Sequence, residues 1–468
     1  MKFSNILSGL ATASLALAAT KELAPLRNVI YFDQYHSTNL PSKNITAGIT
    51  HVIMAFANSS LFASETAGTY KPFMPVSDVR ALFDKKTQVG IAIGGWGNSD
   101  GFSKGAASKD SRKVYSKNVA KMVNDLGFDF VDIDWEYPGG NGADVKQVPN
   151  SKKTSEKTTF PLFLHAIKTA IAPKRLSIAV AATQAGMLAY TGNHASEIFA
   201  AVDMLNLMSY DMNGVRGSLH HSSVKETLAA VHRYLSLGLD PRKLNLGLAY
   251  YAKFFQTAAN ATCHRPDVGC RIVEAGNGGD AGSSTSSTFG SMSFEKANVH
   301  PDPPPSNLSV SADGACGAGT AFTCAAGSCC SQYGSCGTTP EYCGTGCQPA
   351  YGTCTGPDVA SSFTKALAHG RLDEKEGGMW YWDADAKLFW TWDTAALVER
   401  KFREIIKPLG LGGVMGYSLG MDAADWSHIR AVSHMVKGAK AKAKAKAGGH
   451  HSHRPKSHER RLRDGIGH

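Results

Sequence analysis

The chain has 468 residues, of which 43% are hydrophobic and 19% are charged, a balance that excludes a disordered protein. Its net charge of +10 lies mostly at the C-terminus. Residues 437–468 hold ten Lys and Arg against Glu459 and Asp464, which leaves only +2 (10 − 8) for the rest of the chain. A nearly neutral body fits an uncharged substrate and gives no reason to expect a nucleic-acid partner.

Residues 1–19 have the features of a secretory signal peptide. Lys2 precedes a short apolar run that ends in the small residues 16–19. The alternative is a buried N-terminal helix, but the segment has no amphipathic pattern. No later run reaches the roughly 18 apolar residues of a membrane span. We therefore expect a secreted, extracellular protein with no membrane segment. Its sequons for N-glycosylation are Asn44, Asn58, Asn260 and Asn307.

Apolar runs of strand length recur along the chain, separated by stretches with helical character. Most runs are continuous rather than alternating, which favours strands covered on both faces, as in a parallel sheet with helices outside. Helical candidates include residues 111–126, 160–172 and 223–237. Eight such units predict an α/β fold, a (β/α)8 TIM barrel over residues 22–436. The predicted strands are residues 28–33, 51–57, 89–96, 128–136, 176–183, 204–211, 244–250 and 413–419.

An acidic ladder ends the fourth of these strands. Asp132, Asp134 and Glu136 are spaced two apart and therefore share one face, and Asp129 begins the series. In a barrel this face points inward, and the C-terminal strand ends line the active site. Three confined carboxylates repel one another and lose hydration. At least one should therefore hold a proton near neutral pH, as general-acid catalysis requires.

A salt-bridged turn or a metal site could also be rich in acids, but neither fits this ladder well. A salt-bridged acidic turn is disfavoured because no Lys or Arg interrupts residues 128–138, whose other members are largely apolar or aromatic. A divalent metal site is disfavoured because neither histidines nor a carbonyl-rich loop lie nearby in the sequence. We expect no metal and no cofactor.

The regular alternation breaks after residue 255. Residues 256–378 are rich in Gly, Ser, Thr and Pro and contain all ten cysteines, and we interpret them as an insertion between the seventh and eighth barrel strands. Adjacent Cys329 and Cys330 do not fit the paired C-x-x-C spacing of a zinc site, so in a secreted protein we expect disulfides. Cys263 and Cys270 should pair locally. The barrel is expected to resume after Met379.

The tail, residues 437–468, alternates Ala with Lys before a stretch rich in His and Arg. We expect a basic, low-complexity tail that is solvated and disordered. The alternative is that the positive charge of this tail attracts it to anionic wall polymers.

The ladder Asp129-x-x-Asp132-x-Asp134-x-Glu136 resembles the signature of glycoside hydrolase family 18, the chitinase family. Residues 93–96 resemble the third-strand motif of that family, and residues 208–211 resemble its sixth-strand motif. The order of the segments, with an insertion before the last strand, resembles secreted fungal chitinases. The resemblance implies an enzyme, expected to be a monomer, that hydrolyses β-1,4 linkages in chitin and N-acetylglucosamine oligomers, with endo action favoured.

The resemblance also implies a retaining, substrate-assisted mechanism. Glu136 would protonate the glycosidic oxygen, and the 2-acetamido carbonyl of the substrate would be the nucleophile. Asp134 would hold the acetamido N–H and share a proton with Asp132. Tyr210 and Asp211 would orient the acetamido group.

Aromatic side chains suit a polysaccharide cleft because sugar rings stack on them. The residues expected to bind substrate are Tyr31, Phe56, Gly95, Trp96, Tyr137, Met208, Asp211 and Tyr417. Two positions depart from the family: Tyr417 stands where a Trp is usual, and Ala92 stands where a Ser is usual. For most of Trp380, Trp382, Trp390 and Trp392 we expect core packing.

The cysteine spacing from Cys316 to Cys354 (seven, four, zero, five, six, three and six residues) resembles hevein-type chitin-binding modules, here residues 313–355. In that family a serine and three aromatics hold N-acetylglucosamine. Ser331, Tyr333 and Tyr342 match, whereas Ser335 replaces an aromatic, so we expect weak binding. The resemblance implies the disulfides Cys316–Cys330, Cys324–Cys336, Cys329–Cys343 and Cys347–Cys354.

Two alternative functions remain open. A lectin of this family would bind chitin without cutting it, but such relatives replace the last acid of the ladder, which is retained here as Glu136. An endo-β-N-acetylglucosaminidase would act on glycoproteins, and a chitin-binding insertion would be of no use to it.

Overall fold

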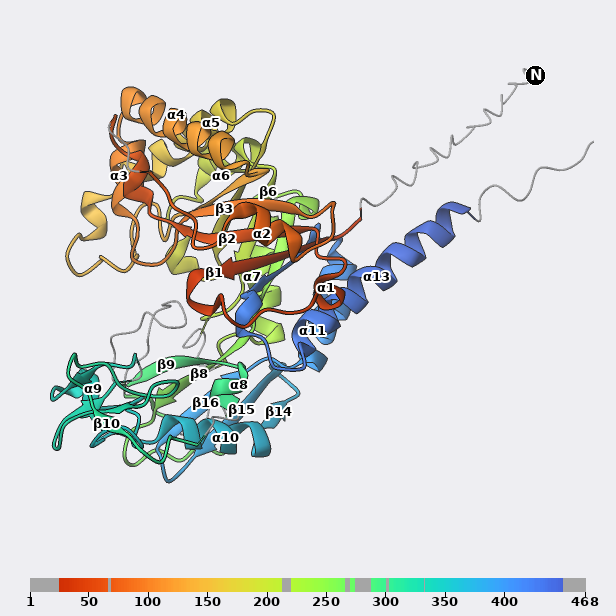
Figure 1. Ribbon diagram of the computed structural model, residues 1–468. Helices are drawn as coiled ribbons and strands as arrows, with labels where there is room; N and C mark the ends of the chain where they lie inside the picture. The colour runs from red at the N-terminus through yellow and green to blue at the C-terminus, as the bar shows by residue number, and fades with distance from the viewer. Residues whose placement is uncertain are drawn as a thin grey trace, which may run out of the picture.

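The computed structural model describes residues 25–65, 69–212, 220–265, 270–273, 288–299, 303–331 and 333–448 (Figure 1). The predicted signal peptide, residues 1–19, lies outside these ranges. Within them, no helix combines the length and the apolar character that crossing a bilayer requires.

Eight parallel strands close into a barrel in the order β1-β17-β7-β6-β5-β4-β3-β2, with β1 paired to both β2 and β17. Each predicted strand is present, and the predicted TIM barrel is confirmed. β1 and β2 end where predicted, whereas the other six strands end one to three residues earlier, where the chain leaves the sheet to form the rim. Their bounds are β1 (Arg27–Asp33), β2 (His51–Ala57), β3 (Gln88–Gly94), β4 (Phe130–Asp134), β5 (Arg175–Ala181), β6 (Met204–Met208), β7 (Leu244–Ala249) and β17 (Gly413–Tyr417).

Helices cover the outside of the barrel. The side chains of Ser108 and Ser111 cap the N-terminus of α4, and Gly127 ends it in the left-handed conformation with φ of 74°. The three predicted helices correspond to α4, α5 and α7, and the predicted bounds differ from the observed ones by at most four residues. The helices of this layer are α1 (Lys43–Thr46), α2 (Val76–Ala81), α3 (Asp100–Ala106), α4 (Lys109–Leu126), α5 (Glu156–Ala170), α6 (Gly192–Ala201), α7 (Val224–Ser236), α11 (Ala395–Lys401), α12 (Lys407–Leu409) and α13 (Ser427–Gly448).

A second, five-stranded antiparallel sheet lies beside the barrel, in the order β14-β15-β16-β8-β9 (Figure 1). Helices α8 (Lys296–Val299) and α10 (Val359–His369) accompany it, and Phe254, Phe363 and Trp390 lie in a core that it shares with α10. The strands are β8 (Tyr251–Gln256), β9 (Phe289–Ser293), β14 (Arg371–Asp373), β15 (Gly378–Asp383) and β16 (Leu388–Trp392).

The extent of the inserted segment differs from the expectation of residues 256–378. Strand β8 already belongs to the second sheet, and so do β15 and β16, which we expected to follow the return to the barrel at Met379. The physical reason is that these strands bury apolar side chains just as barrel strands do. As expected, most of the tryptophans are core residues: Trp390 is 0%, Trp392 3% and Trp380 7% exposed.

The C-terminal tail also differs in part from its expectation. Helix α13 continues to Gly448, so residues 437–448 are helical rather than disordered. The reason is local, because Ala and Lys are both strong helix formers. Residues 449–468 lie outside the described ranges.

A buried ion pair joins the end of the second sheet to the barrel. The ammonium group of Lys401, at the end of α11, contacts the carboxylate of Asp393, which directly follows β16, and both side chains are 0% exposed. The backbone carbonyl of Asp393 also lies 3.0 Å from His428 Nε2, on α13. This junction therefore connects β16, α11 and α13.

Replacement of Lys401 by Met should destabilise the protein by about 3 kcal/mol or more, because the carboxylate of Asp393 is left buried without a counter-charge. The measurement is urea unfolding. The double variant Lys401→Met/Asp393→Leu should be clearly more stable than the single variant. Lys121→Met is the matched control, since the Lys121–Asp125 pair is exposed (72% and 56%) and should contribute less than about 1 kcal/mol. Equal losses in the two Lys→Met variants would contradict the prediction.

Candidate active site

The acidic ladder occupies the inner face of β4 and the turn that follows it. Asp132 and Asp134 lie on the strand and Glu136 lies two residues beyond Asp134, and their exposed fractions are 0%, 4% and 6%. The alternate residue Trp135 points outward, where its ring stacks on Phe102 of α3 at 5.3 Å. The apolar outer face fixes the strand, and the acids are directed into the barrel.

Asp132 is held by three hydrogen bonds from three other strands. Its Oδ2 accepts from Tyr31 Oη at 2.6 Å, and its Oδ1 accepts from Ser177 Oγ at 2.5 Å and from Asn206 Nδ2 at 3.0 Å. Burial raises the pKa of Asp132, and the three hydrogen bonds oppose that shift. Ser177 and Asn206 were not among the predicted site residues. Each is the only uncharged polar residue of a largely apolar strand, and that pattern is the signal that could have identified them.

Tyr137 lies against the last acid of the ladder. Burial raises the pKa of the Tyr137 phenol well above its ordinary value, and the charge of Glu136 and a hydrogen bond to it raise the pKa further. The phenol is therefore a neutral donor beside the carboxyl group of Glu136. On its other side the Tyr137 ring lies 6.3 Å from the half-buried indole of Trp96.

Aromatic rings line the barrel around the ladder. The ring of Tyr417 lies 5.7 Å from that of Tyr31 and 6.2 Å from that of Tyr210. All three residues are at least nine-tenths buried. The structure thus brings Tyr417, which departs from the usual Trp of the family, together with the expected Tyr31 and Tyr210.

The remaining predicted residues lie at the same rim. Phe56 lies near the C-terminal end of β2, and Gly95 follows β3 with φ of 92°. A Cβ on Gly95 would come within 3.1 Å of the Phe56 ring, so glycine at this position lets the end of β3 lie close to that ring. Met208 ends β6, and both Met208 and Phe56 are half-buried.

Asp211 lies in a charged cluster that the sequence analysis missed. It accepts a hydrogen bond from Tyr251 Oη at 2.9 Å, and its Oδ1 lies 2.9 Å from Lys253 Nζ and 3.5 Å from His221 Nδ1. Tyr251 and Lys253 belong to β8, so the second sheet supplies side chains to this site. Nothing in the local sequence of Lys253 marks this role, because the contact exists only through the fold.

The charges in this cluster have a definite arrangement. Burial lowers the pKa of His221, so its imidazole is neutral near pH 7. Burial has the largest single effect and by itself would raise the pKa of Asp211, but the charge of Lys253 and the hydrogen bonds from His221 and Lys253 together hold that pKa below its ordinary value of 3.8. The cluster therefore consists of one carboxylate and one ammonium, with a neutral histidine beside them.

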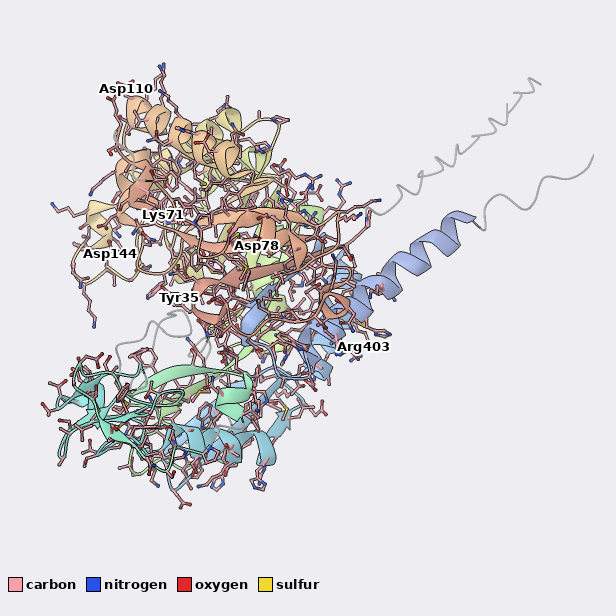
Figure 2. All side chains as sticks on the ribbon, in the orientation of Figure 1. Tyr35, Lys71, Asp78, Asp110, Asp144 and Arg403 are labelled. Carbon is pink, nitrogen blue, oxygen red and sulfur yellow. A yellow bond between two sulfur atoms is a disulfide. The ribbon has the colours of Figure 1, made fainter. Side chains whose placement is uncertain are left out.

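An exposed aromatic ring also stands at the barrel mouth. Tyr35 lies two residues beyond the end of β1 and is 72% exposed. Figure 2 places it on the side of the barrel that faces the second sheet. It was not among the predicted binding residues because no motif includes it.

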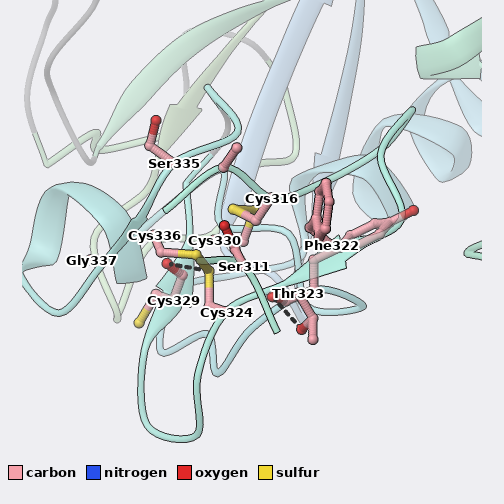
Figure 3. Close-up of a disulfide and its surroundings, with 12 residues drawn as sticks. Ser311, Cys316, Phe322, Thr323, Cys324, Cys329, Cys330, Ser335, Cys336 and Gly337 are labelled. Carbon is pink, nitrogen blue, oxygen red and sulfur yellow. Dashed lines mark hydrogen bonds between the residues drawn. A yellow bond between two sulfur atoms is a disulfide. The ribbon is translucent and has the colours of Figure 1, made fainter. Parts of the chain in front are cut away.

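The disulfide-rich segment forms a separate small unit at one end of the second sheet (Figure 1). Its elements are β10 (Ser309–Val310), β11 (Phe322–Thr323), β12 (Cys329–Cys330), β13 (Cys336–Gly337) and α9 (Pro340–Cys343). Figure 3 shows the sulfurs at its centre. The disulfides join the same pairs that we expected: Cys316–Cys330, Cys324–Cys336, Cys329–Cys343, Cys347–Cys354 and the local Cys263–Cys270.

The three expected sugar contacts of this unit differ in exposure. Tyr333 is 53% exposed, whereas Ser331 is 3% exposed and its hydroxyl accepts the backbone N–H of Ser335 at 3.3 Å. Tyr342 is half-buried and covers Gly337, where a Cβ would come within 2.3 Å of its ring. Tyr333 is the most accessible of the three.

Replacement of Lys253 by Met should raise the pKa of Asp211 and destabilise the protein by about 3 kcal/mol near neutral pH. The folded pKa of Asp211 is below the unfolded value of 3.8, so the pair stabilises the protein fully above pH 3.8. That stabilisation is lost as the pH falls through the lowered pKa. Unfolding measured from pH 7 to pH 2 should show the difference between variant and wild type shrinking as the pH falls from the raised pKa of Asp211 in the variant to its lowered pKa in the wild type. A pH-independent difference would refute this account.

A family model, glycosyl hydrolases family 18, matches residues 27–422. Chitinase 1 of Aphanocladium album is 28% identical over 265 residues, which cover 49% of this chain and 61% of that protein. Chitinase A1 of Niallia circulans is 28% identical over 195 residues, which cover 36% of this chain and 27% of that protein. Both matches span less than two thirds of the relative.

Solved structures share the fold. The second catalytic domain of the group II chitinase of Ostrinia furnacalis, a mutant in complex with penta-N-acetylchitooctaose, matches with a TM-score of 0.60 at 18% identity, covering 88% of this chain and 97% of that one. A chitinase from Rhizomucor miehei matches with a TM-score of 0.59 at 16% identity, covering 87% and 99%. With the family model covering most of the barrel and its acidic ladder, the chain belongs to glycosyl hydrolases family 18.

Proposed function

We propose that this protein is a secreted chitinase that cleaves β-1,4 linkages between N-acetylglucosamine units, with Glu136 as its general acid and base. The observation that carries the proposal is the complete ladder of Asp132, Asp134 and Glu136, buried at the C-terminal end of β4 in a family 18 barrel. Relatives with the name chitinase and a structural neighbour with a bound chitin oligosaccharide support the substrate class.

The proposed reaction needs only one acid from the protein. Glu136 protonates the glycosidic oxygen, and the acetamido carbonyl oxygen of the substrate attacks the anomeric carbon to form an oxazolinium ion. Water then opens this ring with Glu136 as the base, so the anomeric configuration is retained. The raised pKa of Asp132 supports a shared proton between Asp132 and Asp134. Asp134 then holds the acetamido N–H.

The rest of the site supports an N-acetylated sugar as the substrate. The phenol of Tyr210 and the carboxylate of Asp211 are adjacent polar groups just beyond the end of β6, and the Tyr210 ring lies beside that of Tyr417, on which a sugar could stack. Lys253 keeps Asp211 ionised. An ionised carboxylate accepts a hydrogen bond from a sugar hydroxyl or amide group, so its charge favours productive orientation.

We also propose that residues 313–355 form a hevein-like module that tethers the enzyme to insoluble chitin. Four disulfides within about 40 residues take the place of an apolar core that so short a segment cannot build. The exposed ring of Tyr333 is the sugar contact that its surface offers most openly. Disulfide bonding is also consistent with an oxidising, extracellular location.

Glu136→Gln should leave folding and chitin binding unchanged but lower hydrolysis of N-acetylglucosamine oligomers by about 10²- to 10⁴-fold, the usual contribution of a general acid. Product release from soluble oligomers and from chitin is the measurement. Glu226→Gln is a matched control, because Glu226 is 1% exposed but lies on α7, in the helical layer, and not on the acidic ladder.

Three outcomes of these assays separate the possible functions. Equal activity of Glu136→Gln and wild type would refute the mechanism. A wild type that binds chitin and does not cut it would be a lectin. Cleavage of a high-mannose glycoprotein in preference to chitin would identify an endo-β-N-acetylglucosaminidase.

Tyr333→Ala should weaken binding to insoluble chitin about fivefold, since a stacked aromatic ring contributes roughly 1 kcal/mol, while turnover of soluble oligomers stays the same. Phe322→Ala is the matched control, because Phe322 is an exposed ring (42%) of the same module that has no counterpart in the sugar-binding pattern. Equal loss of binding in both variants would contradict the proposed sugar contact, and an unchanged Tyr333→Ala would do so as well.

A further inference from the structure

A chain of side-chain hydrogen bonds crosses the barrel interior and ends on the acidic ladder. Arg27 Nε donates to Asn245 Oδ1 at 2.8 Å, and Asn245 Nδ2 donates to Asn206 Oδ1 at 2.8 Å. Asn206 Nδ2 then donates to Asp132 Oδ1 at 3.0 Å. Both asparagines are 0% exposed. The chain runs from a guanidinium at the N-terminal end of β1 to a carboxylate near the C-terminal end of β4.

The barrel backbone is arranged so that this chain fits. Asn206 and Asn245 are paired directly across β6 and β7. Gly413 of β17 separates Asn245 from Arg27 in the strand register. A Cβ at Gly413 would come within 2.7 Å of both Asn245 Oδ1 and the Arg27 side chain, so only glycine leaves space for their contact.

All donors in the chain point toward Asp132. Reversing the Asn206 amide would turn its carbonyl oxygen toward the Asp132 carboxylate, and its amide nitrogen would then face the nitrogen of Asn245. The two charged ends therefore fix the direction of both amides. Hydrogen bonds aligned in one direction polarise one another in a dry interior, so the positive charge of Arg27 strengthens the last bond to Asp132.

Other groups also act on Asp132 and have to be considered with this chain. Tyr31 on β1 and Ser177 on β5 donate to it, and Asp134 lies on the same strand. Burial raises the pKa of Tyr31, and the charges of Asp132, Asp134 and Tyr210 raise it further. Ala92, which is paired with Asp132 from β3, offers no polar atom. At the far end Arg175 and His51 lie near Arg27.

We propose that Asn206 is a positioning residue: as the last donor of the Arg27–Asn245–Asn206 chain, it keeps Asp132 negatively charged, so that the proton shared by the aspartate pair stays on Asp134. The inference rests on the proposed chitinase mechanism, in which Asp132 and Asp134 share one proton and Asp134 holds the acetamido N–H. The inference adds to that mechanism a buried chain of hydrogen bonds, which starts at the opposite end of the barrel and determines which aspartate holds the proton.

The test is the pH profile of kcat/KM for an N-acetylglucosamine oligomer with Asn206→Leu. Without its donor, the anion of Asp132 is less stable, so the aspartate pair loses its first proton at a higher pH. The acid limb of the profile should move up by about one pH unit, which corresponds to the loss of one hydrogen bond to a charged group. The alkaline limb reports Glu136 and should not move. kcat should fall more than KM changes.

Further variants separate this role from a purely structural one. Asn245→Leu should move the acid limb in the same direction by a smaller amount, although Asn245 touches no carboxylate. Asn28→Leu is the matched control, since Asn28 is a buried asparagine of β1 whose amide meets Ser433 instead, and its profile should equal that of wild type. If Asn206→Leu is too unstable to assay, the double variant Asn206→Leu/Asn245→Leu replaces both asparagines, so neither amide is left buried without the other. Its acid limb should also move to higher pH.

An unchanged acid limb in the assayable Asn206 variant, or an equal shift of both limbs, would overturn the proposal. Titration of the ¹³C-labelled aspartate carboxyl groups by NMR, with Asp132→Asn for assignment, provides a readout that needs no turnover. The Asp132 resonance should titrate at a higher pH in Asn206→Leu than in wild type. An inactive wild type would refute the proposed function, whereas an unshifted resonance would refute the role of Asn206.

Discussion

The carboxylate of Asp132 is fully buried, and the hydrogen bonds that stabilise its charge come from three other barrel strands. Tyr31, Ser177 and Asn206 supply these bonds from β1, β5 and β6. Because successive side chains of a strand point to opposite faces, a shift of one residue in any of these strands would remove a donor. The ionised carboxylate of Asp132 is therefore stable only when the barrel closes in its observed register.

The second sheet takes part in the site through its first strand. One residue, Tyr250, separates β7 from β8, so β8 begins at the rim of the barrel and its Lys253 reaches Asp211. Asp211 itself adopts a left-handed conformation with φ of 56°, which L residues rarely adopt. Its contacts with Tyr251 and Lys253 offset the cost of that conformation. The inserted segment is therefore part of the active-site wall.

The sequence predicts the barrel and the ladder well because each produces a recognisable pattern among residues that are close together in the sequence. A strand covered on both faces is a continuous apolar run, and Asp132, Asp134 and Glu136 show their common face by their spacing. The extent of the insertion could not be predicted, since β15 and β16 bury tryptophans as densely as a barrel strand buries its aliphatic residues. The helical start of the tail was obscured because its Ala and Lys content also matches that of low-complexity segments.

The disulfide-rich segment lies in the sequence between β9, a strand of the second sheet, and α10, a helix that packs against that sheet. A module at the end of a chain is released by a single proteolytic cut in its linker. Here a single cut on either side of residues 316–354 leaves the module covalently attached through the other flank, and its four internal disulfides keep its own loops together. If the module binds chitin as proposed, an enzyme exposed to foreign proteases would remain attached to the insoluble polymer after the first cleavage.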